Sequence, residues 1–351
     1  MLLPLLLSMT QANFRAEAQA LTQSIQERFW DPTKSHYAAN VSEQGQASKK
    51  PAFAWDMAVQ LSALAAATAK NPTYQNLFDQ ADASLQTYGS QYNGVFGYAV
   101  LPRQKQPDRY YDDNEWIALA QLDAFDATKD IKYLNQAVQT FKFVMSGESN
   151  ELGGGIYWRE KEKKSKNTCS NAPAIAIAAR LYMAADDPGF LKTAVSLHNW
   201  VEQLKDSKDN LMFDAMSLDG KIEKRKWTYN TALMIRSDLL LYQATRQEPY
   251  LTEAIQMAIA AKSHWVDKQT GAIHDEGNFA HHLAEAFLVL EPYDKEGDWR
   301  NTALKAIQYA YTNGSKQGLF GKRWDRYEAP DQKLILLWQA SMARALWLAS
   351  E

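Results

Sequence analysis

The lengths of the connections between predicted helices constrain the fold of this chain more than any other feature of its sequence. Apolar residues recur with the 3.6-residue period of amphipathic helices in twelve segments, and little of the chain alternates like a strand. The predicted helices span residues 13–29, 53–69, 74–89, 114–127, 131–145, 172–184, 188–204, 228–244, 248–265, 279–290, 298–313 and 331–349. Short connections at 70–73, 128–130, 185–187, 245–247 and 291–297 alternate strictly with long ones at 30–52, 90–113, 146–171, 205–227, 266–278 and 314–330.

This alternation predicts a closed ring of helices. Helices joined by short connections run antiparallel, so six helical hairpins follow, and their long connections all emerge on the same face. Segments 53–69 and 172–184, which follow long connections, are the more apolar set, whereas segment 13–29 keeps a polar side. Helices that are apolar all round belong inside a fold. We therefore predict an all-α fold with negligible sheet, an (α/α)6 barrel of inner and outer helix rings that forms a single domain over residues 13–351.

Charge and cysteine content exclude several functional classes. The net charge is −3 and the pI is near 6.1, and the densest basic segments, 161–166 and 221–226, are short and contain acids. Nucleic acid is therefore not an expected partner. The single cysteine, Cys169, excludes an intrachain disulfide and a multi-cysteine metal site. No cofactor is implied, and we expect a monomer.

The first twelve residues have two interpretations. The apolar run at residues 1–8 is too short to span a bilayer and lacks the basic start of a signal peptide, so stable membrane insertion is not expected. The sequence Thr10-Gln11-Ala12 nevertheless fits a small-residue cleavage site. Residues 1–12 are thus either the remnant of a signal peptide or the frayed start of the first helix, and both a cytoplasmic and a secreted location stay open.

Residues at the starts of the inner helices are predicted to line a cleft at the end that carries the long connections. Aromatic faces there suit the C–H side of a sugar ring, and amides and carboxylates suit its hydroxyls, so an oligo- or polysaccharide is the expected partner. The predicted substrate-binding residues are Trp55, Asp56, Tyr111, Asn114, Trp116, Asn171, Trp227, Tyr229, Asn230, His281, His282 and Trp324. Helix capping is the structural alternative for Asn171 and Asn230. No metal site is predicted, because His281 and His282 lack further ligands at helical spacing.

Two adjacent carboxylates, Asp112 and Asp113, stand where a polar loop turns into the apolar run that begins at Trp116. Capping of the helix start by Asp113 or Asn114 is the simple interpretation. A cap needs one polar residue, however, whereas four consecutive polar residues lie here between aromatics, which favours a carboxylate pair for acid–base and nucleophilic chemistry. Two carboxyls about 5–5.5 Å apart suit retaining glycoside hydrolysis, and their proximity raises the pKa of one of them, which suits a proton donor.

Several segments together resemble glycoside hydrolase family 76, the endo-α-1,6-mannanases and related bacterial enzymes with an (α/α)6 barrel. They read YYDDNEW from Tyr110, GGGIYWR from Gly153, KNTCSNAP from Lys166 with AARLY from Ala178, and WTYN from Trp227, in the family's order. The resemblance implies a retaining glycosidase acting on an α-linked mannose-type glycan, with Asp112 as the nucleophile and Asp113 as the general acid/base. Residues 279–282 depart from the family's pattern.

Two other classes of protein remain as alternatives. Sugar 2-epimerases use the same barrel, with histidines as proton carriers, and His274, His281 and His282 lie where such an isomerase would require them. That chemistry has no use for adjacent aspartates at a helix start. A catalytically silent glycan-binding barrel is the other class, in which the aspartates only hydrogen-bond sugar hydroxyls. Release of reducing ends separates the hydrolase from the silent barrel, and epimer formation from a free sugar identifies the isomerase.

Overall fold

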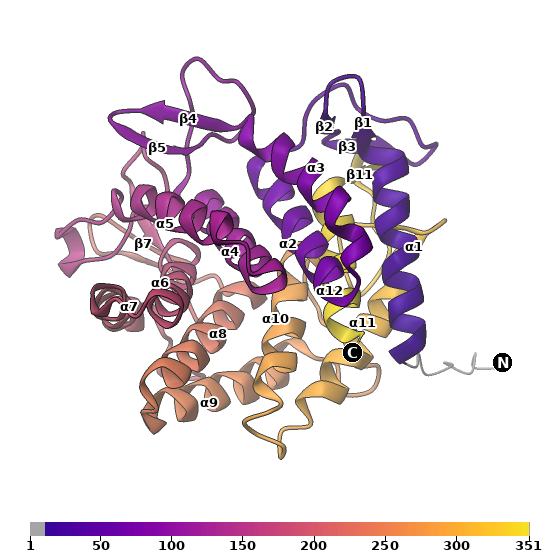
Figure 1. Cartoon of the computed structure of the whole chain (residues 1–351). Coiled ribbons are helices and arrows are strands. Elements are labelled where there is room, and N and C mark those ends of the chain that lie inside the picture. Colours follow the sequence, from indigo (N-terminus) through magenta and orange to yellow (C-terminus); the bar gives the residue numbers. More distant parts are fainter. Residues whose placement is uncertain (1–10, 351) are drawn as a thin grey trace.

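Twelve α-helices make up most of the computed structural model, which describes residues 11–350 (Figure 1). Every helix predicted from the apolar period is present. The helices are α1 (Gln11–Phe29), α2 (Ala54–Lys70), α3 (Gln75–Gln86), α4 (Tyr111–Thr128), α5 (Ile131–Met145), α6 (Ala172–Ala185), α7 (Pro188–Val201), α8 (Thr228–Thr245), α9 (Glu248–Trp265), α10 (Gly277–Leu290), α11 (Trp299–Asn313) and α12 (Leu336–Ala349). Residues 1–10 lie outside the described residues. They make up most of segment 1–12, which was interpreted as either a signal-peptide remnant or the frayed start of the first helix.

The helices form two concentric rings, which confirms the predicted (α/α)6 barrel. Helices α2, α4, α6, α8, α10 and α12 each pack against the next, and α12 packs against α2 to close the inner ring. Helices α3, α5, α7, α9 and α11 each cover the inner helix before them. The sixth outer helix, α1, packs along α12, so the indigo and yellow ends of the described chain lie side by side in Figure 1. Short connections therefore close five hairpins, and the expected sixth hairpin is instead a pairing of the chain's two ends.

Burial distinguishes the two rings. Helix α2 buries both faces, including the run from Asp56 to Ala65, whereas α3 buries only Phe78, Ala81, Ser84 and Leu85. This difference follows from composition, because α2 is rich in alanine and leucine while α3 carries aspartate and glutamine on its outer side. The removal of the inner helices' apolar surface from water is the main stabilising contribution to such a barrel.

Short strands occur in the long connections, which the sequence did not lead us to expect. Among residues 11–350 they form five small antiparallel sheets: β1 (Trp30–Asp31) with β2 (His36–Tyr37), β3 (Asn40–Ser42) with β11 (Lys333–Ile335), β4 (Gly89–Tyr92) with β5 (Val95–Tyr98), β6 (Ser165–Asn167) with β7 (Ala215–Ser217) and β8 (Ile222–Glu223), and β9 (Ser315–Lys316) with β10 (Leu319–Phe320). Strands of two to four residues are too short to show a period-2 pattern. The fold is predominantly helical, as predicted, and the short strands of the long connections are the feature that was not predicted from the sequence.

Pairing of distant strands gathers the long connections at one end of the barrel. Strand β6 in connection 146–171 pairs with β7 in connection 205–227, and β3 pairs with β11 near the C-terminal end. Because residues 333–335 pair with β3, the last helix begins at Leu336 and not at the predicted residue 331. The gathered loops cover the N-terminal ends of the inner helices.

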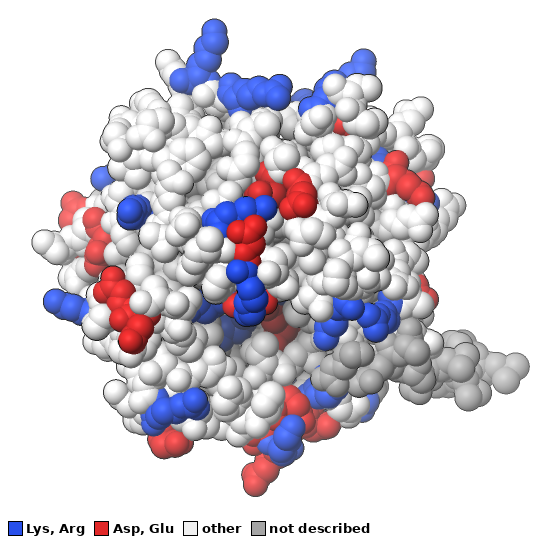
Figure 2. Space-filling model, in the orientation of Figure 1, with Lys and Arg blue, Asp and Glu red and all other residues white. Residues whose placement is uncertain are grey.

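The surface of the described chain carries charges of both signs. Figure 2 shows acidic and basic side chains scattered over the viewed face, with wide uncharged areas between them. None of the helices within residues 11–350 is both long and apolar enough to cross a lipid bilayer.

Candidate active site

A cavity of about 580 Å³ opens where the inner helices begin. Helices α2, α4, α8 and α10 contribute to its wall together with the long connections before α4, α6 and α8. Six of the residues predicted for the site line it, namely Trp55, Asp56, Asp112, Asp113, Trp116 and Tyr229. The other lining residues are Phe53, Val100, Tyr110, Trp158, Ser165, Asn167, Cys169, Asp214 and Phe279.

Helix α4 presents both central aspartates in its first turn. The N-cap position belongs to Tyr110, whose extended backbone precedes the helix, and Tyr110 makes no capping bond with its side chain. The capping interpretation of Asp113 and Asn114 is therefore wrong, because both residues lie inside the helix. The positive end of the helix dipole favours a carboxylate at this position.

Donors around the two carboxyl groups differ. Oδ2 of Asp112 accepts a hydrogen bond from Nε1 of Trp158 at 2.8 Å and one from Sγ of Cys169 at 3.5 Å, and Oδ1 accepts the backbone N–H of Asp113 at 3.0 Å. Burial raises the pKa of Asp112 to about 6, and these donors oppose the rise. Burial raises the pKa of Asp113 well above its ordinary value, and the charges of Asp112 and Asp56 raise it further. The pair therefore favours an ionised Asp112 beside a protonated Asp113.

Two more carboxylates face the cavity: Asp56, which precedes the aspartate pair in the sequence, and Asp214, which follows it. Asp56, at the start of α2, accepts the backbone N–H of Phe53 at 3.4 Å, and burial raises its pKa to about 7. Asp214 lies in the long connection before α8 and accepts hydrogen bonds from Asn230, at 3.1 Å, and from Trp227. Trp227 and Asn230 thus orient Asp214 and do not themselves line the cavity, contrary to the prediction.

Aromatic rings form much of the remaining wall. Phe279 stacks on Tyr229 with ring centroids 4.4 Å apart and on Trp55 at 6.0 Å. Trp158 meets Tyr110 edge to face at 5.0 Å. These rings belong to α2, α8, α10 and the loops beside α4, so tertiary packing brings together aromatic surfaces that are far apart in the sequence. Flat apolar walls of this kind suit the C–H faces of a sugar.

Three predicted substrate-binding residues prove to be buried supports. Tyr111 stacks on Phe143 at 5.0 Å, facing away from the cavity. The amide of Asn114 exchanges hydrogen bonds with the backbone of Tyr98 and donates to the Tyr110 carbonyl. Asn171 repeats this arrangement with Ile156 and Asn167, and its side chain does not cap α6. The polar groups of both amides are satisfied by backbone, so neither is available to a ligand.

Trp324 was predicted to face the ligand, but it is buried under the start of α10. Its side chain is 2% exposed, and a Cβ atom added to Gly277 would approach its Cδ1 to 2.9 Å. Trp324 therefore packs against the start of α10 and does not line the cavity.

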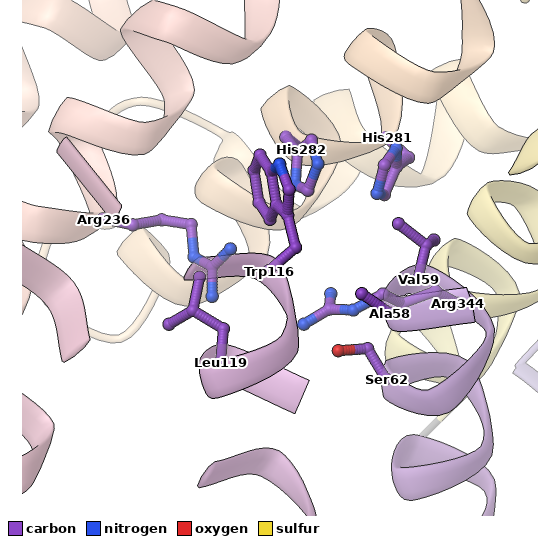
Figure 3. Close-up of a pocket in the computed structure, with 9 residues that line it drawn as sticks. All are labelled: Ala58, Val59, Ser62, Trp116, Leu119, Arg236, His281, His282 and Arg344. Atoms are coloured by element: carbon purple, nitrogen blue, oxygen red, sulfur yellow. The ribbon is translucent and has the colours of Figure 1, made fainter. Parts of the chain in front are cut away.

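The two adjacent histidines lie in the interior of the barrel, behind Trp116 (Figure 3). With Arg236 and Arg344 they surround a gap of about 10 Å³, and His282 stacks on Trp116 at 4.6 Å. Burial lowers the pKa of His281 well below its ordinary value and that of His282 to about 4, so both are neutral. They do not line the sugar-sized cavity, which removes the proton carriers that an isomerase would need.

Other polar clusters give no metal centre. Among residues 11–350 no group of three or more His, Cys, Asp or Glu side chains is arranged to hold a metal ion. His274, the third histidine considered for an isomerase, is half exposed and lies 3.1 Å from Asp325.

Comparison with known families decides the relationship of this chain. The sequence model described as Glycosyl hydrolase family 76 matches residues 13–346, which is nearly the whole chain. The chain belongs to glycosyl hydrolase family 76. Its barrel, its adjacent aspartates and its aromatic cavity are therefore those of a glycosidase family member.

Solved structures of family 76 proteins superpose closely on this barrel. The family 76 α-mannanase of Bacteroides thetaiotaomicron is 28% identical, with a TM-score of 0.90 over 96% of this chain and 95% of that chain. The α-1,6-mannanase of Salegentibacter sp. HEL1_6 is 22% identical, with a TM-score of 0.82 over 96% of this chain and 99% of that chain. That structure is of an inactive variant with two consecutive aspartates changed to asparagine, in complex with α-1,6-mannotriose.

Curated relatives come from yeasts. The Meiotically up-regulated gene 191 protein of Schizosaccharomyces pombe is 24% identical over 91% of this chain and 80% of its own length. The mannan endo-1,6-alpha-mannosidase DCW1 of Saccharomyces cerevisiae is 24% identical over 55% of this chain, which matches 48% of the length of that protein. Relatives of this family 76 chain thus occur in fungi as well as in bacteria.

Sequence reasoning missed several residues of the family 76 cavity. Trp158, Ser165, Asn167 and Cys169 lie within or beside the segments that carry the family resemblance, so that resemblance was a usable signal for them. Phe53, Tyr110 and Phe279 lie within two residues of positions that were predicted. Val100 and Asp214 carried no comparable signal, since they lie in long connections whose path is decided only by packing.

Proposed function

We propose that this family 76 protein hydrolyses α-1,6-linked mannan with retention of anomeric configuration, through Asp112 as the nucleophile and Asp113 as the general acid/base. The observation that carries the proposal is the unequal environment of two adjacent carboxyl groups in one aromatic-walled cavity. Hydrogen bonds from Trp158 and Cys169 favour the ionised form of Asp112, whereas burial and nearby carboxylates keep Asp113 protonated. The mannan-directed activity named for relatives supports the choice of sugar.

The reaction follows from these two protonation states. Asp113 gives its proton to the glycosidic oxygen while Asp112 attacks the anomeric carbon, so the bond to the leaving sugar breaks and a glycosyl-enzyme ester forms. Asp113, now ionised, then takes a proton from water, and that water attacks the same carbon and releases Asp112. Two displacements restore the original configuration.

Lining residues would hold the sugar during these steps. Phe279, Tyr229 and Trp55 offer ring faces. Asp56 and Asp214 offer acceptors at the cavity wall. This division of aromatic faces and polar edges suits a neutral hexose chain.

Product analysis tests the reaction itself. We expect the protein to release reducing ends from α-1,6-mannan but not from α-glucan, and to give a product whose anomeric configuration, read by NMR during the first turnovers, is retained. Inversion would contradict the retaining mechanism, whereas no cleavage of any α-mannoside would leave the silent glycan-binding barrel as the better description.

Two substitutions test the assigned roles. Asp112→Asn should be inactive on mannan and on an activated aryl α-mannoside, because no nucleophile remains. Asp113→Asn should lose activity on mannan but keep part of it on the aryl glycoside, whose leaving group needs no proton. Circular dichroism of both variants checks folding, and full activity of Asp112→Asn would overturn the assignment.

A further inference from the structure

The position of the donors around Asp112 bears on which carboxylate oxygen reacts. We propose that Trp158 and Cys169 are positioning residues that hold Oδ2 of Asp112, so that Oδ1 is the atom that attacks the anomeric carbon. This inference rests on the proposed function, and it assigns a role to Trp158 and Cys169 that is separate from holding the sugar.

Hydrogen-bond counting identifies the reacting oxygen. A carboxylate oxygen has two lone pairs. Both lone pairs of Oδ2 are engaged, one by the indole N–H of Trp158 at 2.8 Å and one by the thiol of Cys169 at 3.5 Å. Oδ1 accepts the backbone N–H of Asp113 at 3.0 Å and no hydrogen bond from a side chain among the described residues. Oδ1 is therefore the oxygen that no side chain holds, and the one available to form the new bond.

Trp158 and Cys169 are each held by their surroundings. The backbone N–H of Trp158 donates to the Ser165 carbonyl at 3.1 Å, and its carbonyl accepts the N–H of Tyr111 at 3.0 Å. This second bond ties the loop directly to the first residue of the helix that carries Asp112. Cys169 is 3% exposed in the 3-10 turn before α6, where a chain movement that withdrew the thiol would disrupt the core.

The two donors have a different effect on each half of the reaction. In the first half the Oδ1–C1 bond forms, the bond from C1 to the leaving oxygen breaks and Asp113 supplies that oxygen's proton, so Oδ2 becomes the ester carbonyl. In the second half a water molecule attacks C1, the anomeric carbon, and gives its proton to Asp113. The Oδ1–C1 bond then breaks, and its electron pair returns to Asp112. Donors to Oδ2 stabilise the carboxylate more than the neutral ester, so they make Asp112 a better leaving group. Their loss should slow the second half more than the first.

The fall of kcat/KM at low pH, here called the acid limb, reports on the ionisation of Asp112. The titratable groups that face it are Asp113 and Glu115 on α4, Cys169 before α6, Tyr229 on α8 and Tyr110 before α4. Burial raises the pKa of every one of these groups, which favours their neutral forms beside Asp112. Burial raises the pKa of Asp56 to about 7, close to that of Asp112, so the shift of the limb in each variant relative to wild type is the quantity that reports on Asp112.

The test uses the full chain with three variants and one matched control. Trp158→Phe keeps the ring beside Tyr110 but removes the N–H, Cys169→Ala removes the thiol, and Cys169→Ser keeps a donor. Trp200→Phe is the control, because the Trp200 indole also donates one hydrogen bond to a neighbouring stretch of loop, at the Leu152 carbonyl, without touching Asp112.

We expect the acid limb of kcat/KM to move upward by about half to one pH unit in Trp158→Phe and in Cys169→Ala. The kcat on an activated aryl α-mannoside should fall about three- to tenfold, with a larger burst of aryl alcohol because the glycosyl-enzyme accumulates. Cys169→Ser and Trp200→Phe should keep the wild-type acid limb.

Each contrary result has a definite meaning. An unmoved acid limb in both Trp158→Phe and Cys169→Ala, with an active wild-type protein, would overturn this inference alone. The same holds if Cys169→Ser behaves as Cys169→Ala, or if Trp200→Phe moves the limb equally, because the effect would then be structural. A wild-type protein without activity on any α-mannoside would overturn the proposed function and this inference together. If Cys169→Ala does not fold, the more exposed Trp158→Phe decides the question.

Discussion

Two aspartates next to each other in one helical turn have different chemistry because their neighbours differ. Asp112 receives three hydrogen bonds, two of them from residues 46 and 57 positions away in the sequence. Asp113 is surrounded by further carboxyl groups, and Asp112, Asp56 and Asp108 all raise its pKa beyond the effect of burial. Pairs of groups whose surroundings separate their pKa values are typical of acid and base partners.

This difference predicts a bell-shaped dependence of activity on pH. Asp112 works when ionised, and its pKa is raised to about 6, so kcat/KM on mannooligosaccharides should fall as the pH drops through about 6. Asp113 works when protonated, so activity should fall again as the pH rises through its raised pKa. An activated aryl α-mannoside should lose the second limb only, because its leaving group needs no proton. Activity maintained down to about pH 4, the ordinary range of aspartate, would contradict this account.

At the level of elements, three side-chain amides join the long connections to the inner helices in the same way. Asn114 in α4, Asn171 directly before α6 and Gln339 in α12 each accept one backbone N–H from a residue of a long connection and donate to the carbonyl of that same residue. Each amide also donates to the carbonyl four residues earlier in its own chain. The side chain therefore acts like a strand partner for the loop and fixes the loop to the helix start.

Asn171→Ala tests this structural role. The change leaves the N–H and C=O of Ile156 without partners in the buried interior, so we expect the free energy of unfolding in urea to fall by about 1–3 kcal/mol. KM of the folded fraction should stay within about twofold of wild type, because Asn171 does not line the cavity. The control is Asn313→Ala, an exposed amide with the same bond to the carbonyl four residues before it, which should cost less than about 0.5 kcal/mol. A large rise in KM without loss of stability would restore Asn171 as a substrate-binding residue.

The whole barrel is tied together by a chain of polar contacts across its interior. Asp123 of α4 pairs with Arg180 of α6 and Arg344 of α12 and accepts from Ser62 of α2. Arg344 pairs in turn with Glu285 of α10, which pairs with Arg236 of α8. All six inner helices therefore contribute, and Figure 3 shows Ser62, Arg236 and Arg344 near the histidines and Trp116. Despite burial, Arg236 and Arg344 hold the pKa of Glu285 well below its usual range.

Removal of Arg344 should therefore destabilise the entire ring. Arg344→Met keeps much of the side-chain volume but leaves Glu285 and Asp123 with fewer cationic partners, so we expect a loss of about 3–5 kcal/mol in urea unfolding. The matched control is Arg326→Met, which breaks exposed pairs with Asp325 and Glu328 and should change stability by less than about 1 kcal/mol. Equal effects of the two substitutions would show that the interior network adds nothing to the barrel.

The sequence by itself determined the helices, their order in two rings and the place of the aspartate pair. Apolar period and connection length are local properties, and the antiparallel pairing that short connections impose leaves few ways to arrange twelve helices. The packing of α1 against α12 does not follow from this rule, because these helices lie at the two ends of the described chain and no short connection joins them.

Only the tertiary structure decided which side chains face the cavity. Asn114 and Asn171 have the composition of ligand-binding residues, yet loop backbone uses their amides, while Trp158 and Asp214 reach the cavity from loops whose course the sequence pattern does not record. The short strands escaped prediction for the same reason, since β3 and β11 are stabilised by each other across almost the full chain. A polar side chain takes whichever partner the fold brings within hydrogen-bond distance, and that partner is set by packing between distant segments.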